Sequence, residues 1–173
     1  AKVKTSRQIT GNLMMPGFTA PKLLWVQRHE PEIFSQIDKV LLPKDYLRLR
    51  MTGDFASDMS DAAGTMWMDV AKRDWSDEML AACHLTRDNM PALYEGCDIT
   101  GKLLPSVASA WNMPAVPVVA GGGDNAAGAV GVGMADAGQA MLSLGTSGVY
   151  FAVSEGFLSK PESAVHSFCH ALP

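Results

Sequence analysis

The sequence predicts an α/β fold, because helix signals alternate with short apolar runs of strand length. Lys39–Leu42 is an apolar run that predicts a strand, and Pro43 directly after it opens a predicted helix that ends at Gly53. Val116–Ala120 is a second apolar run, and the glycines after it predict a buried strand that leads into a turn. No internal repeat or low-complexity tract interrupts this alternation.

The other elements are predicted from caps and periodicity. A helix is expected from Thr19 and Pro21 to near Pro31, a segment of loop followed by strand over Asp54–Asp69, and a further helix over Pro105–Trp111. Ser76 is expected to start a helix. The Pro43 helix is expected to have Tyr46, Leu47 and Leu49 on one side. Side chains expected to be buried are Met79, Leu80 and Cys83 after Ser76, and core-filling methionines such as Met14, Met15, Met66 and Met68.

Composition and charge narrow the class of protein. The 173 residues are 47% hydrophobic with a formal net charge of -4, which is typical of a globular chain of one domain or slightly more. The acidic balance lacks the basic face that phosphate backbones require, so we expect no nucleic-acid partner. No apolar run approaches the about 20 residues of a membrane-spanning helix, and Ala1–Gln8 is too polar for a signal peptide. We therefore expect no membrane partner and a cytoplasmic location.

The cysteines and the chain ends give two further expectations. Cys83, Cys97 and Cys169 are an odd number at wide spacings, which favours reduced core thiols over a disulfide framework. The sequence begins at Ala1 rather than at Met and stops at Pro173 after an apolar stretch, so we expect a piece of a longer protein.

Asp124 is the candidate catalytic residue. It follows Gly121, Gly122 and Gly123, at the predicted change from strand to helix, where the positive end of the helix dipole stabilises a carboxylate. Glycine in a helix costs about 1 kcal/mol relative to alanine, so this glycine run predicts close approach by another backbone or a ligand. An ionised carboxylate there can accept a hydroxyl proton. The alternative is that Asp124 only caps the helix.

A second candidate site is a predicted β-hairpin. Ala140–Leu144 and Val149–Val153 are strand candidates joined by Gly145, Thr146, Ser147 and Gly148. Backbone N–H groups and the hydroxyls of such a turn can hold phosphate oxygens, although the same residues are common in any hairpin turn. His166 and His170 lie four residues apart beside Cys169, but strand-like neighbours argue against helical spacing, so we expect no metal site.

Four segments together resemble the FGGY carbohydrate kinase family. Gly17–Val26 matches the family's first signature, in which Lys-x-x-Trp follows a Ser, Thr or Pro position. Thr52–Thr65 is similar to the loop after that helix, Gly121–Gly128 to the segment with the catalytic aspartate, and Ser143–Gly148 to the second phosphate hairpin. These segments occur in family order over nearly the whole chain. The residues of these motifs, together with the ending His166–Pro173, are most similar to those of bacterial members that phosphorylate D-xylulose.

The resemblance implies an actin-like, ribonuclease-H-like two-domain sugar kinase. Residues 1–138 would be the second half of the sugar-binding domain, and residues 139–173 the beginning of the nucleotide-binding domain. Asp124 would be the catalytic base and would bind the sugar together with Asn125. Gly145, Thr146 and Ser147 would hold the phosphates of ATP, with Mg²⁺ bound to the nucleotide. A homodimer is compatible with the resemblance.

The resemblance also has gaps. The family's first phosphate hairpin, Asp-x-Gly-Thr, and its upstream sugar contacts are absent from the sequence, as are most of the adenine pocket and the second signature. We therefore expect the isolated chain to be inactive. Two alternatives stay open: a kinase of the same family for ribulose, fuculose or glycerol, and a binding domain that keeps the fold without turnover.

Overall fold

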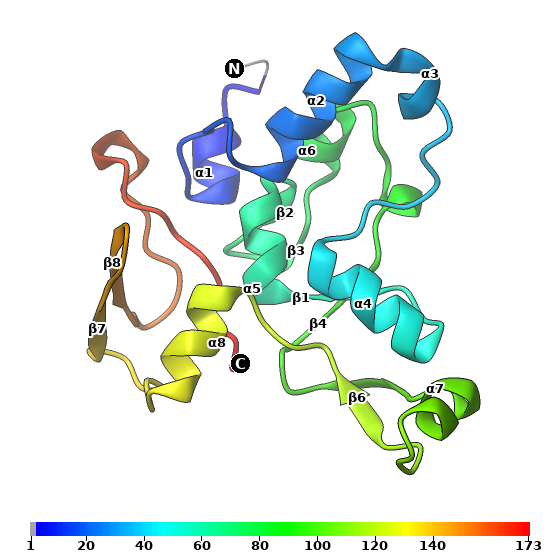
Figure 1. The fold of residues 1–173 in the computed structure, drawn as a ribbon. Helices are drawn as coiled ribbons and strands as arrows, with labels where there is room; N and C mark the ends of the chain where they lie inside the picture. The colour runs from blue at the N-terminus through cyan, green and yellow to red at the C-terminus, as the bar shows by residue number, and fades with distance from the viewer. Residues whose placement is uncertain (1–2) are drawn as a thin grey trace.

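The computed structural model describes residues 3–173, in which helices surround short strands (Figure 1). The helices are α1 (Ser6–Thr10), α2 (Thr19–His29), α3 (Pro31–Phe34), α4 (Pro43–Thr52), α5 (Met59–Ala62), α6 (Asp77–Ala81), α7 (Pro105–Ala110) and α8 (Asp124–Gly131). The strands are β1 (Ala56–Asp58), β2 (Met68–Asp69), β3 (Asp74–Trp75), β4 (Ala92–Tyr94), β5 (Ile99–Lys102), β6 (Pro117–Val119), β7 (Ala140–Leu144) and β8 (Gly148–Ala152). Short 3-10 helices are η1 (Ala63–Thr65), η2 (Arg87–Asn89) and η3 (Pro161–Ser163).

Within residues 3–173 the strands pair two by two. β1 and β4 run parallel, with Asp58 opposite Tyr94. The pairs β2–β3, β5–β6 and β7–β8 are antiparallel. Parallel pairing requires a long crossover connection, so that the second strand can run in the same direction as the first. The connection from β1 to β4, which contains α5 and α6, provides this crossover. The predicted α/β fold is therefore confirmed as a mixed α/β arrangement.

The core lies where α2 and α6 pack against the segment from α5 to β3. Met66, Trp67, Met68 and Leu80 are fully buried there, and Cys169 joins them from the end of the chain. The predicted burial of Met66, Met68 and the α6 face is confirmed. It is wrong for two other methionines and one cysteine, because Met14, Met15 and Cys97 lie in exposed connections.

The predicted strand at Lys39–Leu42 is wrong. This segment is extended and partly buried, but it belongs to no strand pair. The Val40 amide donates one hydrogen bond, of 2.9 Å, to the Asn89 carbonyl, and a strand needs a ladder of such bonds. The apolar character of the segment reflects packing of Val40 against the core.

Within Asp54–Asp69, the prediction of a loop before the strand is wrong. The segment up to Thr65 contains β1, α5 and η1, and it is largely buried. Its polar residues serve as buried caps: the Asp58 carboxylate, which is fully buried, accepts hydrogen bonds from the amides of Ser60 and Asp61 at 2.8 and 3.1 Å. The predicted strand at its end is confirmed as β2.

Helix α4 forms as predicted and ends at Gly53, which has a left-handed φ of 85°. Its apolar side chains Tyr46 and Leu47 are exposed. The buried side chains are polar: Asp45, Arg48 and Thr52. The Arg48 guanidinium donates to the Thr100 hydroxyl at 2.6 Å, so α4 is held to β5 by hydrogen bonds.

Strand β6 is confirmed within the predicted run Val116–Ala120, but it is not buried. Pro117 and Val119 are exposed, whereas Ala120, just beyond the strand, is buried. β6 pairs only with β5 in the described chain, and its middle residue, Val118, is half-buried. No helix in residues 3–173 has both the length and the apolar character to cross a membrane.

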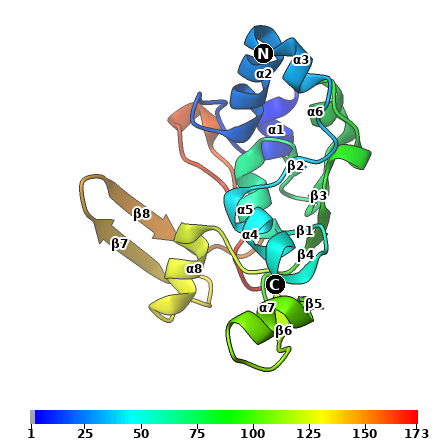
Figure 2. The same ribbon diagram turned by 45° about the vertical axis from the view of Figure 1, so that its right-hand side comes forward.

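The end of the chain returns to its beginning through Asn12. The Asn12 side chain, 1% exposed, accepts a hydrogen bond from the Ser167 amide and donates one to the Ser167 carbonyl, each at 2.8 Å. It also donates to the Thr10 carbonyl at 2.8 Å. Between these anchored ends, the β7–β8 hairpin stands away from the body (Figure 2).

Asn12→Ala should lower the free energy of unfolding by about 2 kcal/mol or more, because it leaves buried groups of Ser167 and Thr10 without partners. Urea denaturation of the purified chain would measure this. Gln8→Ala removes an exposed amide from the preceding helix and should change stability little. Equal effects of the two substitutions would show that the Asn12 hydrogen bonds do not hold the end of the chain.

Candidate functional site

Asp124 and Asn125 lie at the N-terminus of α8, and both are exposed. Asp124 is the first helical residue and the N-cap is Gly123, so the alternative of Asp124 as the cap is wrong. The Asp124 Oδ1 atom accepts from the Asn125 amide at 2.7 Å and from Asn125 Nδ2 at 3.1 Å. Oδ2 has no hydrogen-bond partner within the described chain, so it is open to accept a proton from a ligand.

A buried ion-pair network lies behind this helix end. Lys44 Nζ, from α4, is 2.6 Å from Asp45 Oδ1 and 2.8 Å from Asp58 Oδ1. Asp45 and Asp58 are 1% and 0% exposed, so the Lys44 ammonium compensates two buried carboxylates. Burial opposes the charged form of Lys44, but these carboxylates raise its pKa overall.

The network reaches α8 through backbone hydrogen bonds. Lys44 Nζ donates to the Ala120 carbonyl at 3.4 Å, and the Ser60 hydroxyl accepts from the Gly123 amide at 2.9 Å. The Ser60 hydroxyl also donates a short hydrogen bond to Asp58 Oδ2. Residues 120–123, the connection from β6 to α8, are therefore held at both ends by side chains from α4 and α5.

The predicted close approach is confirmed at Gly122 and Gly123 but not at Gly128, Gly131 and Gly133, where an added Cβ would meet no atom within 4 Å. Gly96, in the β4–β5 connection, also allows close approach. A Cβ atom on Gly96 would collide with the carbonyl oxygens of Ala171 and Gly121. A Cβ atom on Gly122 would lie 3.2 Å from the Ala171 side chain, which is tighter than usual packing allows. The end of the chain thus packs against the connection that leads to Asp124.

Asp61 is a second carboxylate beside the start of α8. Burial raises its pKa to about 6, the Lys44 ammonium at 4.0 Å opposes this shift, and nearby carboxylates that include Asp124 add to it. The Asp61 backbone and side chain also lie against Gly123, where an added Cβ would meet the Asp61 Cα at 3.4 Å. Asp61 therefore couples electrostatically to Asp124.

The predicted phosphate-binding residues occupy the turn of the β7–β8 hairpin. Gly145, Thr146 and Ser147 are exposed, and the Gly145 amide donates to the Ser147 carbonyl at 2.9 Å. The Thr146 and Ser147 amides and hydroxyls make no hydrogen bond within residues 3–173. The hairpin is confirmed over its predicted strands, and its donors are available to a ligand.

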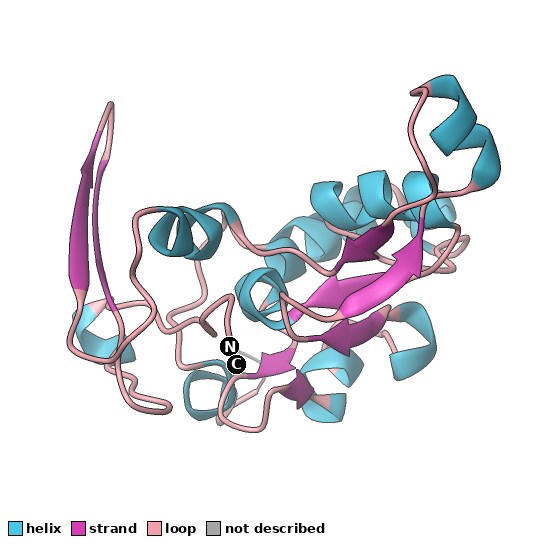
Figure 3. Cartoon of the chain, turned by 90° about the horizontal axis from the view of Figure 1, so that it is seen from below, coloured by secondary structure: helices cyan, strands magenta, loops and turns pink. Residues whose placement is uncertain are grey.

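The structure brings Asp124 and Asn125 together. It does not bring these two residues close to the hairpin turn. The turn points away from α8 in the view from below (Figure 3). No hydrogen bond or ion pair in the described part of the chain joins Gly145, Thr146 or Ser147 to the α8 N-terminus. A ligand that contacts both sites has to span the distance between them.

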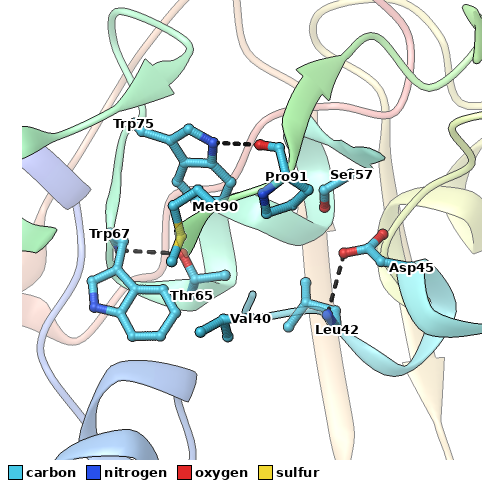
Figure 4. A pocket seen from close by; sticks show the side chains of 9 residues that line it. All are labelled: Val40, Leu42, Asp45, Ser57, Thr65, Trp67, Trp75, Met90 and Pro91. Atoms are coloured by element: carbon cyan, nitrogen blue, oxygen red, sulfur yellow. Dashed lines mark hydrogen bonds between the residues drawn. The ribbon is translucent and has the colours of Figure 1, made fainter. Parts of the chain in front are cut away.

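Two hollows in the described part of the chain lie away from these residues. The cavity in Figure 4 has a volume of about 10 Å³, enough for one water but not for a sugar. It is lined by Val40, Leu42, Asp45, Ser57, Thr65, Trp67, Trp75, Met90 and Pro91. A surface hollow of about 340 Å³ lies beside α6, at the opposite end of the molecule from α8 (Figure 1).

The histidines near the end of the chain serve structural contacts. His166 Nδ1 lies 3.2 Å from Asn12 Oδ1, and the His166 ring packs edge-on against Phe18 at 5.3 Å between centroids. His170 Nε2 lies 3.1 Å from the Met134 carbonyl. Residues 3–173 contain no group of three or more metal-binding side chains.

Sequence reasoning assigned no site role to Lys44, Ser60 and Asp61. For Ser60 and Asp61, the sequence contained a signal of a structural role. Ser57–Asp61 is rich in Ser and Asp and lies directly before an apolar run. Polar residues in such a position are buried and must have partners. Lys44 carried no such signal, because one lysine in the first turn of a helix is ordinary.

The structure is thus an α/β protein with an exposed carboxylate at the start of a glycine-rich helix, backed by a buried charge network. Residues 1–131 match the N-terminal domain of the FGGY family of carbohydrate kinases. The chain belongs to this family.

Known relatives and structures agree with this assignment. The chain is 87% identical to the xylulose kinase of Escherichia coli (strain K12) over 173 residues, and 85% identical to that of Klebsiella pneumoniae over 170 residues. These matches include 100% and 98% of this chain but 36% and 35% of the relatives, so the chain spans about a third of their length. The crystal structure of a Brucella ovis protein described as a xyloylose kinase has 55% identity and a TM-score of 0.96, over 98% of this chain and 35% of that one.

Asp61→Asn should stabilise the chain at pH 7.5 and have little effect near pH 4. The pKa of Asp61 is raised to about 6 in the folded state from 3.8, so the folded state binds the proton more tightly. Stability is therefore lost as pH rises from about 4 to about 6, and the cost persists above that range. We expect a gain on the order of 1 kcal/mol at pH 7.5, measured by urea denaturation at both pH values.

Glu155→Gln is the matched control, because it neutralises an exposed carboxylate of the β8–η3 connection. It should leave stability unchanged at both pH values. A gain for Asp61→Asn that is equal at pH 4 and pH 7.5 would contradict the raised pKa.

Proposed function

We propose that this chain is part of a xylulose kinase that transfers the γ-phosphate of ATP to D-xylulose and forms D-xylulose 5-phosphate. The observation that carries the proposal is the 87% identity to the Escherichia coli xylulose kinase along the full chain, with Asp124 open to solvent at the start of α8. A kinase for a different sugar would be expected to differ from known xylulose kinases in the residues near Asp124. The high identity therefore favours D-xylulose over ribulose, fuculose or glycerol.

In the proposed reaction, Asp124 is the catalytic base. Its Oδ1 is held by the amide and side chain of Asn125, which leaves Oδ2 to accept the proton of the sugar hydroxyl that attacks the γ-phosphate. Phosphoryl transfer has a loose transition state, so positioning of the hydroxyl matters more than a strong base. Asn125 binds the sugar beside Asp124, since its amide can contact a second hydroxyl.

The hairpin turn is proposed to bind the phosphates of ATP. The amides and hydroxyls of Thr146 and Ser147 suit phosphate oxygens, because they are exposed donors without partners in the described chain. Gly145 has no side chain to obstruct a phosphate. Mg²⁺ supplies charge neutralisation and is proposed to be held by the phosphate oxygens of the nucleotide.

The proposal includes the arrangement of the longer protein. Residues 1–138 would belong to the sugar-binding domain and residues 139–173 to the beginning of the nucleotide-binding domain of an actin-like, ribonuclease-H-like kinase. The separation of the hairpin turn from α8 supports a nucleotide that enters from another side than the sugar (Figure 2). The reaction is proposed to take place in the cytoplasm, where ATP is supplied, and a homodimer stays a prediction that light scattering would check.

The proposed function can be tested in a chimeric kinase, in which this chain replaces the matching 36% of the Escherichia coli xylulose kinase. The chimera should phosphorylate D-xylulose in a coupled ADP-release assay, whereas the 173-residue chain alone should not. Asp124→Asn in the chimera should lower kcat at least a thousandfold, because no base takes the hydroxyl proton. Its unfolding temperature should stay close to that of the parent.

Asp136→Asn is the control for this substitution, since it changes an exposed aspartate in the connection after α8. It should leave kcat within twofold. Retention of activity by Asp124→Asn within tenfold would refute the assignment of Asp124, and preference for another sugar in a substrate panel would refute the substrate.

Thr146→Ala in the chimera should raise the KM for ATP about tenfold and leave the KM for D-xylulose unchanged, because one donor to a phosphate is lost. Initial rates at varied ATP would measure this. Ser159→Ala, which removes an exposed hydroxyl after β8, is the control and should change neither constant. An unchanged KM for ATP in the Thr146 variant would contradict a phosphate site at the hairpin turn.

A further inference from the structure

The Ser60 hydroxyl is the link between a buried carboxylate and the start of α8. A serine hydroxyl has one proton to donate and lone pairs to accept with. Its proton goes to Asp58 Oδ2, because that carboxylate can only accept. The lone pairs then face the Gly123 amide, which donates to Ser60 Oγ at 2.9 Å. The direction of both hydrogen bonds is therefore fixed.

The Asp58 carboxylate, which accepts the hydrogen bond from Ser60, is itself held in a fixed position. It is fully buried and is held from four directions: by the Lys44 ammonium, the Ser60 hydroxyl, and the amides of Ser60 and Asp61. A buried charge with this many partners cannot rotate without losing several of them. Ser60 is itself 6% exposed, so water cannot readily replace its hydroxyl.

The start of α8 needs such an external anchor. Its N-cap residue, Gly123, has no side chain that could cap the helix, and no side-chain cap is present. The residues before it are glycines, which restrict the backbone least. The Ser60–Gly123 hydrogen bond fixes the backbone one residue before Asp124, at the point where the helix axis is set.

We infer that Ser60 is a positioning residue for the phosphoryl transfer: held by Asp58, it fixes the Gly123 amide and thereby orients the Asp124 carboxylate toward the sugar hydroxyl. This inference rests on the proposed role of Asp124 as the base. Lys44 supports the same connection from its other end through the Ala120 carbonyl. Ser60 is buried and its hydroxyl is engaged by Asp58 and Gly123, so its effect is on geometry.

Ser60→Ala in the chimeric kinase tests this inference. It should lower kcat at least tenfold, because a displacement of the base of about 1 Å is enough for such a loss. The KM for ATP should stay unchanged, since the hairpin turn is separate from this link. Ser60→Thr keeps the hydroxyl and should retain clearly more of the parent kcat than the alanine variant.

Hydrogen–deuterium exchange supplies a measurement that does not depend on turnover. The peptide that contains Gly123 should exchange faster in Ser60→Ala than in the parent. Ser57→Ala is the matched control, because Ser57 is also buried in this segment and its hydroxyl has no hydrogen bond within the described chain. It should change neither the exchange at Gly123 nor kcat.

The outcomes separate this inference from the proposed function. A kcat within twofold of the parent in Ser60→Ala, unchanged exchange at Gly123, or equal losses in the alanine and threonine variants would each overturn the positioning role. Full activity of Asp124→Asn would instead overturn the proposed function, whatever the exchange at Gly123 shows.

Discussion

The arrangement of this chain depends on the burial of one carboxylate, that of Asp58. A charge fully removed from water is tolerated only with an opposite charge and enough hydrogen-bond donors around it. Lys44 from α4, the Ser60 hydroxyl and two amides at the start of α5 meet this requirement. Satisfying Asp58 therefore fixes α4, β1 and α5 relative to one another.

The charge balance around this network is compatible with the proposed reaction between a neutral sugar and an anionic nucleotide. Lys44 is surrounded by Asp45, Asp58 and Asp61, and Asp61 also interacts with Asp124, so carboxylates outnumber the cation. A sugar is neutral and is not repelled there. The phosphates of a nucleotide are anionic, so the proposed site at the exposed donors of the hairpin turn would receive them more favourably than this acidic end of the molecule.

Local signals predicted several elements, among them the hairpin that contains one of the two proposed sites. A proline and a glycine bounded α4, a serine cap began α6, and a glycine turn between apolar runs gave the β7–β8 hairpin. Each of these features acts within a few residues of the chain, so a sequence pattern is enough to find it.

The errors arose where distant residues decide the structure. Lys39–Leu42 looked like a strand, but no neighbouring strand pairs with it. The polar face of α4 is buried because Arg48 finds partners about 50 residues away, at Thr100. Ser57–Asp61 looked like a loop for the same reason, since its partners lie on α4 and before α8. The local pattern at Ser57–Asp61 indicated buried polar residues but not which distant residues pair with them, so the network behind Asp124 could not be predicted.

The β7–β8 hairpin has a consequence for how a longer protein is built around this segment. It is a ribbon of two strands with no third strand along either edge in the described chain, and Leu142, Leu144 and Tyr150 are exposed on it. Such a ribbon is a template for sheet extension, because its outer amides and carbonyls are ready for another strand. Whatever strand joins it will determine the angle at which its turn meets the rest of the molecule.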